Sequence, residues 1–434
     1  MISISACLNP LLTSSKLNTA VAISLFLFLT SCKPDATQPD QQQTSNPPGS
    51  GSVALADSLA TVDSQATIDS QATMETKALL WNLKKLSGRY LLFGHQDDLA
   101  YGYTWSAYDS NADQGQSDVK AVTGAYPAIS GWDLGHLERG KPTNLDNVNF
   151  AQIQQWIRDT YQRGGISTIS WHMDDPVSGN SSWHKESVVE HIIPGGKAHQ
   201  KFKQFLDQFA RFNAELKVSV DGIETPIPII FRPWHEHSGD WFWWGKGNTS
   251  EADYIKLWQF TVEYLRDKKN IHNLLYAYSP DRSRINLDHF EQDYLWGYPG
   301  DDYVDILGID NYHDFRIADD IDKNLQQQDL IRSLESLADI ATQKNKLAAL
   351  TEGGQETLPD STFWTDRLLA GVLASPKTKK IAFVTVWRNA DHAKENREHF
   401  YAPYPGHPSA KNFVEFYNHP FVMFQDNLPN LYSF

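Results

Sequence analysis

Eight short apolar segments recur along this chain, and each ends abruptly in polar side chains. Between most of them lie amphipathic segments with helical spacing, at 149–163, 197–213, 250–267, 323–344 and 362–374. Regular alternation of buried strands with helices predicts a parallel sheet, and eight repeats predict a (β/α)8 TIM barrel of the α/β class. The expected strands begin at Tyr90, Pro127, Ile166, Pro228, Leu274, Val304, Leu347 and Ile381.

Two glutamates end strands in this pattern. Glu236 ends the fourth segment, PIIFRPWHE, and Glu352 ends the seventh, LAALTE. Catalytic groups of such barrels come from the carboxyl ends of the strands, so the two carboxylates should converge there. Retaining glycoside hydrolysis requires two carboxyl groups, one as the acid/base and one as the nucleophile. The aromatic run from Trp241 to Trp244 follows Glu236 directly, and carboxylates beside indoles indicate a carbohydrate substrate.

The charge of the chain narrows the class of partner. Its formal net charge is −15, and its 38 lysines and arginines form no basic run. Nucleic acid is therefore not expected as a partner, because phosphate neutralisation needs clustered cations. An anionic polysaccharide is disfavoured for the same reason, whereas a neutral one is compatible.

The N-terminal segment has the features of a secretion signal. An apolar stretch from Leu17 to Thr30 follows Lys16, and LTSC ends at Cys32. This ending resembles a bacterial lipobox, in which the cysteine is diacylated; the alternative is an ordinary signal peptide with an incidental cysteine. Because the other cysteine is Cys7, no disulfide framework is expected in the mature chain.

Three parts are expected along the chain. Residues 1–31 would be a lipoprotein signal peptide, and 32–75 a flexible tether rich in polar residues. Residues 76–434 would be the (β/α)8 catalytic domain. A six-residue repeat at 57–74 carries no predicted function.

Several local motifs resemble those of one enzyme family. They are FGHQDDLAYG (93–102), SWH (170–172), FRPWHE (231–236), GIDNY (308–312), LTEGG (350–354) and VWRN (386–389). In order and content they resemble glycoside hydrolase family 26, a retaining clan-A family dominated by β-mannanases. The resemblance spans essentially all of the chain after Thr76, and His235 before the acid/base position favours this family over its clan relatives.

The resemblance implies the roles of the central residues. Glu236 would be the acid/base, and its pKa must rise toward neutrality. Glu352 would be the nucleophile that attacks the anomeric carbon, with Tyr312 placed to hydrogen-bond it. Arg232 has two open interpretations, namely support of Glu352 and a salt bridge inside the barrel.

The resemblance also implies a sugar-binding shell. The residues that would line the subsite of the cleaved bond are His172, Trp183, His235, Trp241 and Trp387. Arg388 matches a position that grips the next sugar toward the non-reducing end. Trp243 and Trp244 are either further stacking platforms or loop packing. No cofactor and no metal are expected.

The expected protein is thus a monomeric β-mannanase, lipid-anchored in a bacterial cell envelope and acting on mannan, glucomannan or galactomannan. One alternative keeps the fold and mechanism but cleaves mixed-linkage β-glucan or β-1,3-xylan. A second is a metal-dependent hydrolase, since the chain reads His-Glu-His from His235 to His237, with His95, His172 and Asp310 as further ligands. A third is a non-catalytic glycan-binding lipoprotein.

Overall fold

A closed barrel of parallel strands forms the centre of the domain. The structure is a computed structural model that describes residues 67–109, 115–318 and 322–434. Within them, each of eight strands pairs with the next along the chain, and the last pairs with the first. These strands are β1 (Leu91–Gln96), β4 (Ile129–Asp133), β5 (Ile166–Ser170), β8 (Ile229–Arg232), β9 (Leu274–Tyr278), β10 (Ile306–Asn311), β11 (Leu347–Gly353) and β12 (Ile381–Val386). The predicted barrel and all eight predicted strands are confirmed.

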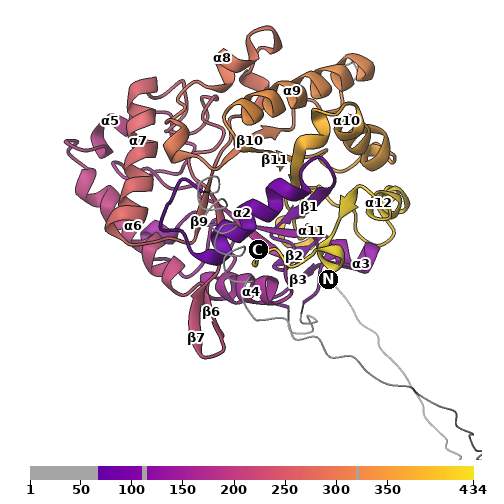
Figure 1. Cartoon of the computed structure of the whole chain (residues 1–434), viewed down its shortest axis with the longest axis horizontal. Coiled ribbons are helices and arrows are strands. Elements are labelled where there is room, and N and C mark those ends of the chain that lie inside the picture. The colour runs from indigo at the N-terminus through magenta and orange to yellow at the C-terminus, as the bar shows by residue number, and fades with distance from the viewer. Residues whose placement is uncertain (1–66, 110–114, 319–321) are drawn as a thin grey trace, which may run out of the picture. The chain divides into compact units, whose positions relative to one another are not determined.

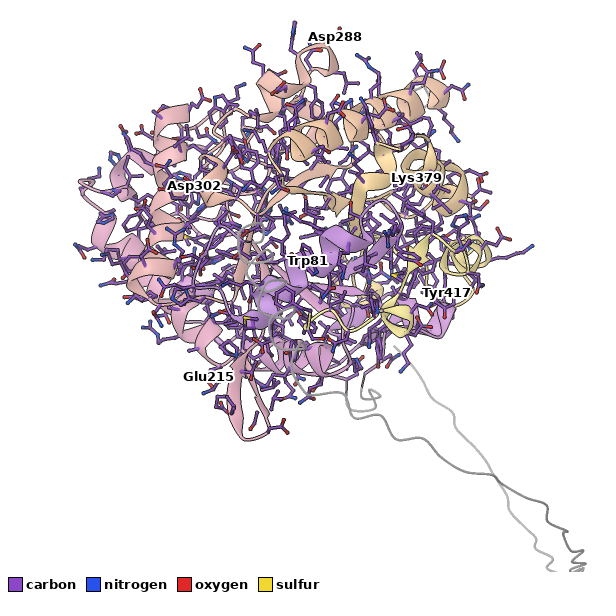
Figure 2. The ribbon with its side chains drawn as sticks, in the orientation of Figure 1. Trp81, Glu215, Asp288, Asp302, Lys379 and Tyr417 are labelled. Atoms are coloured by element: carbon purple, nitrogen blue, oxygen red, sulfur yellow. The ribbon has the colours of Figure 1, made fainter. Side chains whose placement is uncertain are left out.

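Every residue of these eight strands is buried. This explains their apolar composition, because a parallel sheet covered on both faces has no solvent-facing side. Figure 1 shows the larger helices around the outside of the strands. Apolar side chains of strands and helices pack in one large buried cluster, and Figure 2 shows all described side chains on the ribbon.

The predicted helices are also present. They correspond to α4 (Phe150–Gln162), α6 (His199–Ala214), α7 (Glu251–Glu263) with a π turn at Tyr264–Lys268, α9 (Lys323–Gln343), and a π-helical Phe363–Leu369 that leads into α10 (Ala370–Leu373). Asn149, Ser250 and Asp322 begin three of these helices, and each side chain accepts a hydrogen bond from a first-turn amide.

Shorter elements complete the described chain. These are the pairs β2 (Tyr101–Gly102) with β3 (Trp105–Ser106) and β6 (Lys217–Val220) with β7 (Ile223–Pro226), the strand β13 (Val422–Met423) beside β1, and the helices α3 (Asp118–Thr123), α5 (Val189–Ile192), α8 (Phe290–Tyr294), α11 (His392–Glu395) and α12 (Ala410–Tyr417). No helix in the described ranges is long and apolar enough to cross a bilayer.

Helix α2 (Met74–Leu86) closes the amino end of the barrel. Its Leu79, Leu80 and Leu83 are fully buried in one cluster with apolar side chains from the first residues of the strands, such as Ile129 and Ile166. Because all eight strands are parallel, the polar residues at their carboxyl ends gather at the end of the barrel opposite α2.

The described chain joins the barrel before the expected domain start at residue 76. The backbone N–H of Ile68 donates to Asp305 Oδ1 at 2.9 Å, and Asp69 Oδ2 lies 2.8 Å from His272 Nδ1. The expected signal peptide at 1–31, the lipidation site Cys32 and most of the expected tether lie outside the described residues.

Candidate active site

Glu236 is positioned by an unusual turn after β8. Trp234 and Glu236 both have left-handed backbone, with φ of 51° and 52°. Non-glycine residues rarely adopt this conformation, and it persists only where neighbours fix it. Here Tyr254 donates to the carbonyl of Trp234 at 2.8 Å, and the N–H of Glu236 donates to the carbonyl of Ser279 at 2.8 Å. These hydrogen bonds fix the backbone of the turn, and with it the direction in which the Glu236 side chain leaves the strand.

Glu352 lies within β11 and is almost fully buried. The Arg232 guanidinium donates to Glu352 Oε2, and the Tyr312 hydroxyl donates to Oε1 at 2.8 Å. The other arm of Arg232 donates to Asp310 Oδ2 at 2.6 Å. Both interpretations of Arg232 are therefore correct. Its guanidinium supports Glu352 and also forms a salt bridge with Asp310 inside the barrel.

Glu236 has the opposite surroundings. Its burial, followed by the negative charges of Asp281, Glu352 and Asp310, raises its pKa well above the ordinary value for a glutamate. Trp241 Nε1 donates to Glu236 Oε2 at 2.7 Å and opposes this rise. Glu236 therefore keeps a proton to a higher pH than an ordinary glutamate, whereas Glu352 contacts the guanidinium of Arg232.

A pair of histidines borders the two carboxylates. His172 Nδ1 lies 2.7 Å from Asp133 Oδ2, and His172 Nε2 lies 3.2 Å from His235 Nε2. Burial disfavours a charged His172, but the ion pair with Asp133 outweighs it and raises the pKa. Burial, with the charges of Arg232 and His172, lowers the pKa of His235 far below its usual value. Of the two imidazoles, His172 therefore keeps its proton to the higher pH, and the two Nε2 atoms lie within hydrogen-bond distance.

Aromatic rings surround His172. The exposed Trp183 stacks on it at 5.3 Å between ring centroids, Phe242 lies at 5.3 Å edge-on, and Trp387 lies at 6.1 Å. Together with Trp241 above Glu236, these rings form apolar surfaces beside the hydrogen-bonding groups. Such surfaces suit the C–H faces of a sugar ring.

Trp243 and Trp244 do not reach this surface. Both are fully buried, and their indole N–H groups donate to the carbonyls of Met173 and His235 at 2.9 and 2.8 Å. Of the two interpretations that the sequence left open, the structure supports loop packing.

Arg388 lies beside a cavity of about 480 Å³ that Tyr101, Tyr108 and Asp146 also line. Its guanidinium makes two bonds to Glu395, at 2.6 and 3.0 Å, and one to Asp146 at 3.0 Å. Burial opposes charge on Arg388, but its acidic neighbours raise the pKa, so the cation is permanent. The planar group is held with one face on Tyr101, at 5.4 Å.

The sequence did not single out three carboxylates that organise these residues. Asp133 orients His172, while Asp146 and Glu395 fix Arg388. Asp133 ends the strand PAISGWD, so its place at a strand tip was a usable signal. Within the described residues, no group of three or more histidine, cysteine, aspartate or glutamate side chains is arranged to hold a metal ion.

Comparisons with known proteins agree with the site. The profile of Glycosyl hydrolase family 26 matches residues 68–366. A mannan endo-1,4-β-mannosidase from Bifidobacterium adolescentis is 41% identical over 264 residues, which are 59% of this chain and 25% of that protein. The chain therefore spans about a quarter of the length of that relative.

Solved structures give the same result. A family 26 β-mannanase from Bacteroides ovatus has 41% identity and a TM-score of 0.74, over 83% of this chain and 98% of that one. The catalytic domain of an endo-β-1,4-mannanase from Bacillus sp. JAMB-750 has 35% identity and a TM-score of 0.76, over 85% and 96% of the two chains. On the profile match and these likenesses, the chain belongs to glycosyl hydrolase family 26.

Proposed function

We propose that this protein is a retaining β-mannanase that cleaves β-1,4-mannosidic linkages in mannan, glucomannan or galactomannan. The observation that carries the proposal is the contrast between its two glutamates. Glu236 has a raised pKa, whereas Glu352 is held between Arg232 and Tyr312. Double displacement requires this pairing of a protonated acid with an ionised nucleophile.

In the first step, Glu352 attacks the anomeric carbon and forms a glycosyl-enzyme. Arg232 and Tyr312 each donate a hydrogen bond to one of its two oxygens and so orient the carboxylate. Glu236 donates its proton to the departing glycosidic oxygen, so the leaving group departs neutral. In the second step, Glu236 removes a proton from water, which attacks the same carbon and releases Glu352 with retained configuration.

The surrounding groups position the sugar. His172 and His235 border its hydroxyls, while Trp183, Trp241 and Trp387 offer indole faces to its C–H surfaces. Arg388, fixed by Glu395 and Asp146, takes the next sugar toward the non-reducing end.

The preference for mannan over glucan or xylan is tested by initial rates. Unbranched mannan, mixed-linkage β-glucan and β-1,3-xylan are compared at equal mass concentration. We expect mannan to be cleaved at least about tenfold faster, a difference of roughly 1.4 kcal/mol at the transition state, which one hydroxyl contact supplies. Equal or faster cleavage of the glucan would contradict the preference for mannan, but it would not affect the fold or the roles of the two glutamates.

The proposal extends to the whole chain. Residues 1–31 act as a lipoprotein signal peptide, Cys32 carries the lipid, 32–75 form the tether, and a monomeric catalytic domain from 76 to 434 works at a bacterial cell envelope. The supporting observation is the apolar stretch that ends in LTSC at Cys32. Cys32→Ala should move the protein from the detergent fraction to the aqueous one with unchanged activity, and membrane retention of this variant would contradict lipidation.

A further inference from the structure

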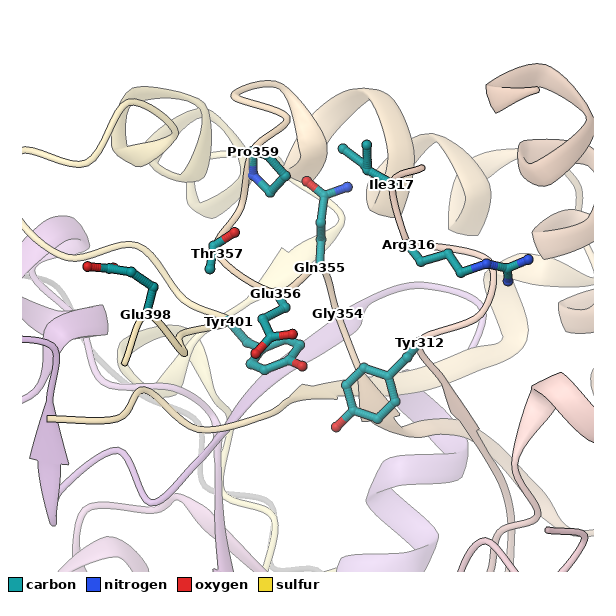
Figure 3. A pocket seen from close by; sticks show the side chains of 10 residues that line it. All are labelled: Tyr312, Arg316, Ile317, Gly354, Gln355, Glu356, Thr357, Pro359, Glu398 and Tyr401. Atoms are coloured by element: carbon teal, nitrogen blue, oxygen red, sulfur yellow. The ribbon is translucent and has the colours of Figure 1, made fainter. Parts of the chain in front are cut away.

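A second cavity is separated from the nucleophile Glu352 by the side chain of Tyr312. It has a volume of about 560 Å³ and lies among the loops that follow β10, β11 and β12. This volume falls within the range of about 300–1,000 Å³ that is usual for small-molecule sites. Figure 3 shows Tyr312 and Tyr401 toward its base, Arg316 and Ile317 along one side, and Thr357 and Glu398 along the other.

The cavity connects to Glu352 through a single side chain. Tyr312, which donates to Glu352 at 2.8 Å, also lines the cavity. Its ring meets that of Tyr401 edge-on at 5.5 Å. A group attached to a sugar in the cleavage position therefore has to pass only Tyr312 to enter.

One wall of the cavity is held in a strained conformation. Thr357 and Leu358 are consecutive left-handed residues, with φ of 59° and 45°. A β-branched residue rarely adopts this backbone, and such strain clusters where a ligand is bound. The N–H of Thr357 donates to the carbonyl of Phe400 at 2.8 Å, and Leu358 is 1% exposed. These contacts fix the wall, so the cavity is a preformed space.

The lining has the mixed character of a sugar-binding pocket. The Arg316 guanidinium has five N–H donors, of which one meets the carbonyl of His313 at 2.6 Å. One carboxylate oxygen of Glu356 accepts from His399 at 2.7 Å, and the group retains further lone pairs for hydroxyls. Ile317 and Tyr401 contribute apolar surface. Donors, acceptors and an aromatic face together suit an uncharged pyranose.

The geometry of a pyranose determines which part of the sugar faces the cavity. In the ring, C2 and the C5–C6 arm lie on opposite sides of the anomeric centre that Glu352 attacks. The side with His172 and His235 offers hydrogen bonds and is filled by Trp183, Phe242 and Trp387. The side with Tyr312 opens into the cavity. The ring hydroxyls therefore face the histidines, and C6 faces the cavity.

We infer that this cavity binds a hexopyranosyl branch carried on O6 of the sugar at the cleavage position, such as the α-1,6-galactosyl branch of galactomannan. The inference rests on the proposed β-mannanase function and adds to it a branch-binding site. A branched mannosyl unit is then a substrate at the cleaved bond, where an enzyme without this space would exclude it.

Product analysis of the unaltered protein tests the inference. Galactomannan is digested to completion, and the oligosaccharides are separated and sequenced by mass spectrometry after reducing-end labelling. We expect products whose reducing-end mannose carries a galactosyl branch, since that mannose occupied the cleavage position. If every reducing end were unbranched while unbranched mannan was still cleaved, the branch site would be rejected and the proposed β-mannanase function would remain. Failure to cleave either polymer would overturn the proposed function and this inference together.

A cavity-filling variant gives an independent measurement. Ile317→Trp places a large ring in the cavity, and Ile223→Trp at the exposed turn of the β6–β7 hairpin is the matched control. We expect Ile317→Trp to lower kcat/KM at least tenfold more on a singly galactosylated mannopentaose than on mannopentaose, and to remove products with branched reducing ends. Ile223→Trp should change neither the ratio of kcat/KM on the two oligosaccharides nor the products. An equal loss on both oligosaccharides, or no change in the products, would count against the branch site.

Discussion

A buried carboxylate at the amino end of the barrel differs in its hydrogen bonding from several buried side chains at the carboxyl end. At the amino end, the carboxylate of Asp305 accepts from the backbone N–H groups of Ile68 and Tyr276, both at 2.9 Å. At the carboxyl end, His95 Nε2, Asp97 Oδ1 and His235 Nδ1 are buried and have no hydrogen-bond partner among the described residues. Backbone amides thus satisfy the carboxylate of Asp305, whereas these three side chains at the carboxyl end keep unused hydrogen-bonding capacity.

We expect residues at the amino end to serve mainly the stability of the fold and residues at the carboxyl end to serve mainly catalysis. Around α2, apolar side chains pack in one buried cluster and contribute to folding. Burial raises the pKa of Asp305 at this end to about 6. At the other end it raises the pKa of three carboxyls, those of Glu236, Asp310 and Asp97, to about 8 for Asp97. Burying a carboxyl in this way costs folding free energy once the pH exceeds its unfolded pKa. Substitutions at the two ends should therefore have distinct consequences, and the following predictions test this.

The largest effect is expected for Glu352→Ala. Without a nucleophile no glycosyl-enzyme forms, and kcat should fall by at least roughly 10⁴-fold, or about 5.4 kcal/mol. Azide should restore turnover with inverted anomeric configuration, measured by NMR of the product. Glu215→Ala, on the exposed end of α6, is the matched control and should retain full activity. Azide rescue with retained configuration would reassign the nucleophile.

Glu236→Ala should be the next most damaging change. General acid catalysis contributes about 10²–10⁴-fold, so kcat on mannan should fall by that amount. Aryl mannosides with activated leaving groups need no proton for departure, and a rapid burst of released phenol should remain. Absence of the burst, with a normally folded protein by circular dichroism, would show that Glu236 is not the acid.

At the opposite end, Leu83→Ala should act on folding. Removing a fully buried leucine from the cluster under the barrel should lower the free energy of unfolding by about 2–5 kcal/mol. Denaturant titration measures this loss, and kcat of the folded fraction should be unchanged. A comparable loss of kcat at full folding would mean that the two ends are not independent.

The smallest change is a shift in pH dependence. Because Glu236 must be protonated for the first step, activity on mannan should decline as the pH rises through its raised pKa. Trp241 lowers that pKa through its hydrogen bond to Oε2, so Trp241→Phe should move the alkaline limb of kcat toward higher pH. The profile of kcat against pH measures the shift, and movement toward lower pH would contradict the assignment.

The sequence predicted the barrel because its signal is local. Each strand is a continuous apolar run, and the main helices have a 3.6-residue period, so both appear within a short window. The β6–β7 hairpin was not predicted, since its exposed Val220 and Ile223 give no buried pattern. The π-helical turns were not predicted either, because their composition is that of an ordinary helix.

At the candidate site, sequence placed single residues better than pairs. Glu236, Glu352 and Tyr312 could be placed at strand tips from their own segments. The contact of His172 with Asp133 joins residues 39 positions apart, and that of Arg232 with Glu352 joins residues 120 apart. The first contact follows only from the closed barrel, whereas the second was one of the two interpretations that the resemblance left open for Arg232. The burial of Trp243 and Trp244 likewise depends on how their loop folds over Met173.

Helix α2 also determines where the domain can be attached. The described chain begins beside Asp305 and His272, which lie just before β10 and β9. The C-terminal segment packs beside α2, where Asn82 donates to the carbonyls of Leu431 and Ser433. Both ends of the domain therefore lie at the face remote from the two glutamates. A surface or a fused module joined at either end leaves the cleft open, so a polymer far longer than the barrel can cross it without meeting the point of attachment.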